Sequence, residues 1–164
     1  MRKNIIDEIS IKMMDFDYKD DQLIKFIESN VVDINEKGLD GRTLAIHTAV
    51  YGRHGVFLYL ISKGADLESC DKIGYTPLHA AVSAKKNEIV KELLKNGVNV
   101  NCKDNNGNSP LLHASHLSVD IIELLLEYGA DPTLKNKFGS CAYDVFGAYS
   151  SIVSLMDKYK EGVL

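Results

Sequence analysis

Paired cysteines, long apolar runs and an amino-terminal export signal are all missing from this 164-residue sequence. Its three cysteines are odd in number and form no C-x-x-C pair, which suits a reducing compartment: Cys70, Cys102 and Cys141. Only Asn4, Ile5 and Ile6 separate the first basic residues from Asp7, which is too short for the apolar region of a signal peptide. No run approaches the roughly 18 apolar residues that cross a bilayer. We therefore expect a cytoplasmic protein with no membrane partner.

Motifs for catalysis, cofactor binding and metal binding are missing as well. The sequence contains no G-x-S-x-G, H-E-x-x-H, Walker or G-x-G-x-x-G context. Its five histidines form no ligand set at a usual metal spacing. The basic residues cluster only at Lys85 and Lys86 with Lys91 and Lys95, too few for contacts along a phosphate backbone. The sequence therefore predicts no enzyme, no cofactor, no metal site and no nucleic-acid partner.

What the sequence does contain is an internal repeat, marked by glycine. Gly41, Gly74 and Gly107 are evenly spaced, and Gly139 follows at nearly the same interval. A second series follows the first three at an almost constant offset: Gly64, Gly97 and Gly129. Two glycine series in phase, with a period of about 33 residues, indicate one structural unit copied several times, which is the signature of a solenoid.

The clearest copy of the unit begins at Thr76, a good helix N-cap, with Pro77 at the first helical position. After a polar interruption, a second apolar periodicity runs to the stop signal at Gly97: Ile89, Val90, Leu93 and Leu94. An extended segment that ends in a turn follows. The two helices are too short to be stable alone, so their apolar faces must be buried by stacking. The prediction is an all-α solenoid of helix-turn-helix units with hairpin-like fingers.

Residues 71–81, Asp-Lys-Ile-Gly-Tyr-Thr-Pro-Leu-His-Ala-Ala, resemble the ankyrin repeat nearly throughout. The segments Gly64 to Leu67 and Gly129 to Pro132 are similar to the second half of that repeat. The resemblance implies an ankyrin solenoid whose function is non-catalytic protein–protein interaction. It also implies that His79 is a structural histidine, hydrogen-bonded to Thr76.

Two copies depart from this pattern, because their histidines come one residue late. His47 and His113 follow Ile46 and Leu112, which occupy the place that His79 has in the clearest copy. We therefore expect Ile46 and Leu112 to fill the buried position. The two copies should then lack the hydrogen bonds of His79.

The repeat extends over the whole chain, which we expect to be one domain and a monomer. Shifting the pattern back by one repeat places helices near Ile5–Met14 and Asp21–Ser29 in a degenerate first unit. The predicted units are an N-terminal cap at 1–40, three central units at 41–73, 74–106 and 107–138, and a C-terminal cap at 139–164.

The curvature of a solenoid provides a concave binding face, lined by finger tips and by one row of helices. By resemblance to the family, we expect a protein partner to contact the tips: Leu39, Asp40, Arg42, Lys72, Ile73, Tyr75, Asn105, Asn106, Asn108, Lys137, Phe138 and Ser140. Periodicity adds a column at the ends of the first helices: Tyr18, Tyr51, Ala84, Leu117 and Tyr149, with His116 in an inter-helix turn beside it. Exposed aromatic side chains are typical interface anchors. The alternative is that these residues only cover the bases of the fingers.

The net charge of −4 belongs to the first unit, since residues 1–40 hold ten acids and six bases, while the remainder holds thirteen of each. Four aspartates surround Tyr18: Asp15, Asp17, Asp20 and Asp21. They form either a solvated cap or an acidic pole that attracts a basic partner. Two specific roles remain open. One is an immunity-type protein that neutralises a toxin, and the other is a scaffold or effector adaptor.

Overall fold

The computed structural model describes residues 4–15, 17–30, 32–114 and 118–160. Within them the chain forms ten helices and no strand: α1 Ile5–Met14, α2 Asp20–Ser29, α3 Leu44–Tyr51, α4 His54–Ser62, α5 Pro77–Ser83, α6 Asn87–Lys95, α7 Pro110–His113, α8 Val119–Glu127, α9 Ala142–Phe146 and α10 Ser150–Lys160. The prediction of an all-α solenoid is confirmed. The two helices expected before Gly41 are present, and α2 begins one residue earlier than predicted.

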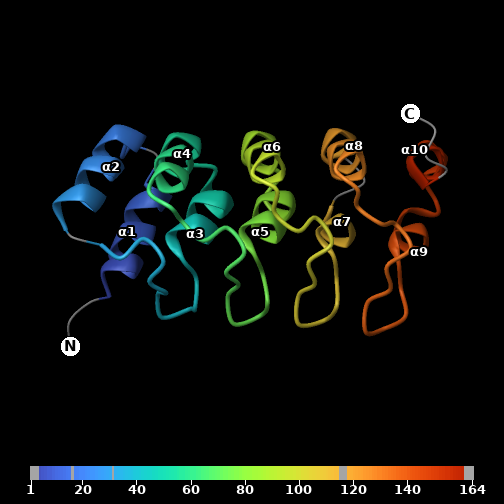
Figure 1. The fold of residues 1–164 in the computed structure, drawn as a ribbon, viewed down its shortest axis with the longest axis horizontal. Helices are drawn as coiled ribbons and strands as arrows, with labels where there is room; N and C mark the ends of the chain where they lie inside the picture. The colour runs from blue at the N-terminus through green and yellow to red at the C-terminus, as the bar shows by residue number, and fades with distance from the viewer. Residues whose placement is uncertain (1–3, 16, 31, 115–117, 161–164) are drawn as a thin grey trace.

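The helices form two parallel rows, and extended loops project from one of them (Figure 1). Odd-numbered helices make the row beside the loops, where α3 packs against α1 and α5, and α5 against α7. Even-numbered helices make the outer row, in which each of α4, α6 and α8 packs against its neighbours. None of the ten helices combines the length and the hydrophobicity that crossing a bilayer requires.

Each helix pair is set by the local signals of the repeat. The Thr76 side chain accepts a hydrogen bond from the amide of His79 and caps α5, and Pro77 occupies its first position. Gly97 and Gly129 follow α6 and α8 with φ of +75° and +86°, a left-handed conformation that other residues adopt only at a cost. These glycines end α6 and α8 and turn the chain toward the next finger.

The core lies between the rows and consists of two clusters. The larger runs from α3 to α10 and includes Phe57, Leu93 and Phe146, all essentially inaccessible. The smaller joins α1 and α2 to the next pair: Ile6, Ile9, Met13, Leu23, Ile27, Leu44, Val56 and Leu60. The first helix pair is therefore fixed to the stack by its own apolar contacts.

Candidate functional site

The extended loops are four fingers of five residues each, which we name in chain order: residues 38–42, 71–75, 104–108 and 136–140. A backbone hydrogen bond closes every finger between its first and last residue, with N–O distances of 2.9, 2.9, 3.0 and 2.9 Å. Figure 1 shows the fingers side by side, all pointing away from the outer row. The fingers therefore present their tips to solvent along one edge of the molecule.

A side-chain acceptor organises the base of three fingers. Asp71 Oδ1 accepts hydrogen bonds from the amides of Ile73 and Tyr75, at 3.0 and 2.9 Å. Asp104 and Asn136 bind the corresponding amides of the third and fourth fingers at 2.8 to 3.0 Å. These bonds hold each tip in one conformation, since an amide buried at a turn must find an acceptor.

The first finger lacks this acceptor, because Gly38 stands where the others have Asp or Asn. A carboxylate from α1 binds a different amide of this finger: Asp7 Oδ1 accepts from the Leu39 amide at 3.1 Å. The Arg42 amide donates to Asp40 Oδ1 at 2.9 Å. Asp7 Oδ1 lies 2.6 Å from the position that a Cβ on residue 38 would occupy, so a larger residue there would have to displace this carboxylate. Sequence reasoning missed this role of Asp7, since α1 carries no repeat motif that would assign it.

Neighbouring fingers are tied into a row. The Asn105 amide donates to the Ile73 carbonyl at 3.0 Å, and the Lys137 amide donates to the Asn106 carbonyl at 2.9 Å. Lys72 links the first two fingers, because its Nζ donates to the Leu39 carbonyl at 2.7 Å. A row that is held in this way loses little conformational entropy when it binds.

The tips carry large apolar side chains that contact solvent. Leu39 is 77% exposed, Ile73 52% and Phe138 76%. Ile73 and Phe138 directly precede the tip glycine, and Leu39 lies one position earlier in its finger. Asn106, which precedes the tip glycine of the third finger, is polar and also exposed. Charged neighbours surround the apolar tips: Asp40, Lys72 and Lys137 are exposed, and Arg42 is half-buried.

A hollow of about 250 Å³ separates the first two fingers, lined by Asp40, Arg42, Asp71, Lys72 and Ile73. Arg42 Nε lies 3.1 Å from Asp71 Oδ2, so one wall of the hollow is an ion pair. Its size fits a side chain of a partner better than a separate ligand.

Tyr75 differs from the exposed tip residue that the sequence predicted. It is half-buried, and its hydroxyl lies 3.1 Å from Nδ1 of His113, whose Nε2 lies 2.9 Å from Asp104 Oδ2. Its ring also packs on His79, with centroids 5.4 Å apart. Burial raises the pKa of the Tyr75 hydroxyl, and the Asp104 carboxylate adds to this. Tyr75 therefore contributes to the base of the fingers.

Two further predicted tip positions also serve the base. Asn108 donates to Asp104 Oδ2 at 3.1 Å and accepts from Nδ2 of Asn136 at 2.8 Å. The amide of Ser140 is bound by Asn136. The side chains of the third and fourth fingers are thus joined at their bases.

His79 makes the contacts of a structural histidine. Its ring is fully buried, and Nδ1 lies 3.4 Å from the Thr76 amide and 3.1 Å from the Thr76 hydroxyl. Because Nδ1 accepts from that amide, Nε2 carries the proton and donates to the Asn108 carbonyl at 3.1 Å. Burial lowers the pKa of His79, which keeps the ring neutral.

The two copies with a late histidine differ from each other. Ile46 is fully buried, as expected, but Leu112 is only half-buried. His113 has hydrogen-bond partners in Asp104 and Tyr75, so the expectation that its copy lacks such bonds is wrong. The physical reason is the side chain of Tyr75, which reaches across from the preceding unit.

The thiol next to His79 is not an activated nucleophile. Cys102 Sγ lies 3.6 Å from His79 Nδ1 and 3.5 Å from the Thr76 hydroxyl. Burial raises the pKa of Cys102 to about 11, so the thiol stays protonated at neutral pH. Within the described residues, no group of three or more His, Cys, Asp or Glu side chains is placed to hold a metal ion.

The predicted column of first-helix residues divides into two kinds. Tyr18 and Tyr51 are half-buried and pack against the smaller core cluster, which favours the covering role. Tyr149 is 39% exposed, and Ala84 is the C-cap of α5. His116 and Leu117 lie outside the described residues.

The four aspartates near Tyr18 do not form one uniform patch. Asp15, Asp17 and Asp21 are exposed, whereas Asp20 is half-buried. Asp20 Oδ2 accepts from the Gly55 amide at 2.8 Å, in the first turn of α4. Asp20 therefore has a structural contact, and the other three carboxylates are exposed to solvent.

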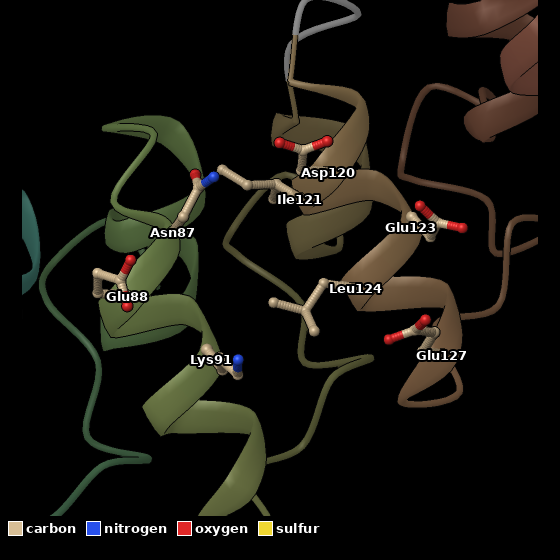
Figure 2. Close-up of a pocket in the computed structure, with 8 residues that line it drawn as sticks. All are labelled: Asn87, Glu88, Lys91, Asp120, Ile121, Glu123, Leu124 and Glu127. Carbon is tan, nitrogen blue, oxygen red and sulfur yellow. The ribbon is translucent and has the colours of Figure 1, made fainter.

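A shallow groove of about 370 Å³ lies between α6 and α8 in the outer row (Figure 2). Four carboxylates and one lysine surround two apolar side chains there: Glu88, Asp120, Glu123, Glu127, Lys91, Ile121 and Leu124. Sequence reasoning missed this groove, because its residues come from two units and meet only when the units stack.

The fold and the fingers define a repeat protein of the solenoid class, with an extended edge for contacts. A family model described as ankyrin repeats (3 copies) matches residues 16–104 and 46–136. The chain belongs to the ankyrin repeat family, whose repeats are protein–protein interaction modules.

Proteins of different origins contain similar segments. BCL-6 corepressor-like protein 1 of Homo sapiens is 40% identical over 104 residues, which cover 62% of this chain and 6% of that protein. The B-cell lymphoma 3 protein homolog of Mus musculus is 36% identical over 117 residues, which cover 70% of this chain and 26% of that protein. Ankyrin repeat protein OPG189 of Variola virus is 29% identical over 136 residues, which cover 82% of this chain and 24% of that protein. The chain thus spans only a minor part of each of these relatives.

Proposed function

We propose that this chain binds a protein partner through the tips of its fingers and performs no chemistry. The observation that carries the proposal is the row of exposed apolar tips, Leu39, Ile73 and Phe138, on fingers that hydrogen bonds hold in place. Apolar anchors on a rigid support, with polar neighbours around them, are the usual elements of a specific interface.

Because of the bonds at the bases of the fingers, the fold does not depend on the tip side chains. Asp71, Asp104 and Asn136 already satisfy the buried amides, so the exposed side chains have no structural bond to lose. A partner can therefore bury Ile73 and Phe138 without disturbing the stack. The gain is the apolar area removed from water, about 25 cal/mol per Å².

Two specific roles fit this surface. The first is neutralisation of one partner, as immunity proteins do with toxins. It is supported by the exposed carboxylates of Asp15, Asp17 and Asp21, which attract a basic protein. The second is an adaptor that joins two proteins. It is supported by the relatives, in which the matching segment is 6% or 26% of a longer chain.

We further propose a monomer that works in the cytoplasm, without membrane or nucleic-acid partners. The free thiols of Cys70, Cys102 and Cys141 support a reducing compartment. Light scattering of the purified protein at micromolar concentration tests the oligomeric state, and a dimer would contradict this part.

The test of the binding surface is a paired capture experiment. The variant Ile73→Ser with Phe138→Ser changes two tips, and the control Leu58→Ser with Val119→Ser changes two side chains of the outer row, each 42% exposed. Proteins that crosslink to the wild type should also crosslink to the control variant, and they should not crosslink to the tip variant. Loss from the control and retention by the tip variant would overturn the proposal.

The two roles are separated with the captured partner. Neutralisation predicts that a stoichiometric amount of this protein abolishes an activity of the partner. An adaptor predicts that the partner stays active and that a third protein joins the complex.

A further inference from the structure

Two histidines stand at equivalent places in the repeat but have different surroundings. His47 and His113 are separated by two repeats of the pattern. His113 is paired with Asp104 at 2.9 Å and with the Tyr75 hydroxyl at 3.1 Å. The residue that corresponds to Asp104 is Gly38, which has no carboxylate. His47 therefore lacks the partner that its finger would supply in the third unit.

His47 is nevertheless buried, with 4% of its surface exposed. Neither ring nitrogen has a hydrogen-bond partner among the described residues, and Nε2 lies 3.8 Å from Asp40 Oδ1. Oδ2 of Asp7 on α1 is also buried without a hydrogen-bond partner among the described residues. A buried polar group without a hydrogen bond costs free energy, so this cluster lowers the stability of the fold.

Four groups surround the imidazole ring. Asp40 and Arg42 belong to the first finger, and Asp7 belongs to α1. The ring of Tyr51 is stacked on His47, with centroids 6.3 Å apart. Arg42 Nε lies 3.1 Å from Asp71 Oδ2 and 3.7 Å from Asp40 Oδ2, so Asp40 already faces one cation. The carboxylates of Asp7 and Asp40 are the groups that can respond to a proton on His47.

We propose that His47, Asp7 and Asp40 form an acid-sensitive latch, in which a proton on His47 draws the two carboxylates to the ring and shifts the first finger. In the neutral state, Asp40 Oδ1 accepts from the Arg42 amide at 2.9 Å, and Asp7 Oδ1 accepts from the Leu39 amide at 3.1 Å. The imidazolium competes with the Arg42 amide for Asp40 Oδ1 and attracts Oδ2 of Asp7, which has no partner among the described residues, because a charged donor makes the stronger hydrogen bond. The Arg42 amide then loses its acceptor, and the Leu39 amide shifts with the Asp7 carboxylate that binds it.

The first finger is the one suited to such a movement. In the second and third fingers one carboxylate binds the amides two and four residues later. In the first finger Asp40 binds only the Arg42 amide, and Asp7 of α1 binds the Leu39 amide. Within the described residues, no backbone hydrogen bond joins the first finger to the second, unlike the pair between Asn105 and Ile73. Side-chain ties such as Lys72 Nζ to the Leu39 carbonyl can adjust to a shift of the tip.

The titration of His47 agrees with this geometry. Burial lowers the pKa of His47 from its usual 6.5, Asp40 and Asp7 oppose the shift, and Arg42 adds to it. Protonation of His47 therefore requires a pH below 6.5, and the ring is neutral at pH 7.

The test is a pH titration of the whole chain by NMR, following the His47 ring together with the amides of Leu39, Gly41 and Arg42. The ring and the three amides should titrate with one common midpoint below 6.5, the usual value. Asp40→Asn removes one opposing charge and should lower that midpoint further. Amides of the third finger, around Asn106, serve as the internal control and should not follow it.

Three results would each overturn the proposal. The first is a His47 ring that does not titrate before the protein unfolds, and the second is a set of first-finger amides that do not titrate with the His47 midpoint. The third is a His47 midpoint in Asp40→Asn equal to that of the wild type. Asp7→Asn provides a second variant with the same expected direction. It keeps an oxygen for the Leu39 amide, so a folding defect in one variant leaves the other to decide.

Discussion

At the bases of the second, third and fourth fingers the same hydrogen bonds recur, whereas at the tips no two fingers carry the same side chain. Asp71, Asp104 and Asn136 each bind two amides of their own finger. At the position before the tip glycine, the four fingers present Asp40, Ile73, Asn106 and Phe138. The backbone of the repeat fixes the bases and leaves the tips free. We therefore propose that the bases provide stability and that the tips provide recognition.

We expect the largest loss of stability from a change at the base of the fingers, His79→Ala. The change removes a buried ring and leaves the Asn108 carbonyl and the Thr76 amide without their bonds, so the free energy of unfolding should fall by about 1–3 kcal/mol. Urea unfolding measures it. His113→Ala, at a half-buried ring, should cost less, and equal losses would contradict the difference between these sites.

The next largest loss of stability is expected from removing a carboxylate that binds finger amides, and two such carboxylates can be compared. Asp104→Ala should lower the free energy of unfolding by about 2 kcal/mol, because two amides and His113 lose an acceptor. Asp7→Ala should cost less, since it frees a single amide and also removes a buried oxygen without a partner. A larger loss for Asp7→Ala would show that the first finger depends on α1 more than the others depend on their own bases.

Acid should weaken the first unit through His47. Because burial lowers the pKa of His47, the unfolded chain binds the proton more readily than the folded one. The free energy of unfolding should therefore fall as the pH drops below 6.5, the usual histidine value. Unfolding of the wild type and of His47→Gln at several pH values measures this. A pH dependence that is the same in both would contradict it.

The smallest effect concerns the exposed aspartates. If they attract a basic partner, Asp17→Asn with Asp21→Asn should slow association about threefold at low salt and much less at 0.5 M, where charges are screened beyond about 4 Å. Asp20 is left unchanged, because it binds the Gly55 amide. Stopped-flow association rates across a salt series distinguish the two alternatives. A rate that changes neither with salt nor with the substitutions would favour the solvated cap.

Much of the fold could be predicted from the sequence, because each unit carries its own signals. Thr76, Pro77 and the two glycine series are local, and their regular spacing transfers them to units where they are weaker. The exposure of Leu39, Ile73 and Phe138 followed from the same alignment.

The features that sequence reasoning missed depend on contacts between units. Asp7 binds the amide of Leu39, far along the chain, and no motif in α1 predicts it. Tyr75 turns inward because His113, in the next unit, offers an acceptor. Such pairings arise only when the units stack, so a repeat pattern cannot predict them.

The separation of bases and tips is tested most directly by measuring binding and stability together in the variants Ile73→Ala and Phe138→Ala. Each should weaken binding of the captured partner by about 2 kcal/mol, the magnitude of an interface anchor, as measured by calorimetry. The free energy of unfolding should stay within about 0.5 kcal/mol of the wild type, because both side chains lie in solvent. Unchanged affinity together with a clear loss of stability would contradict the assignment of recognition to the tips.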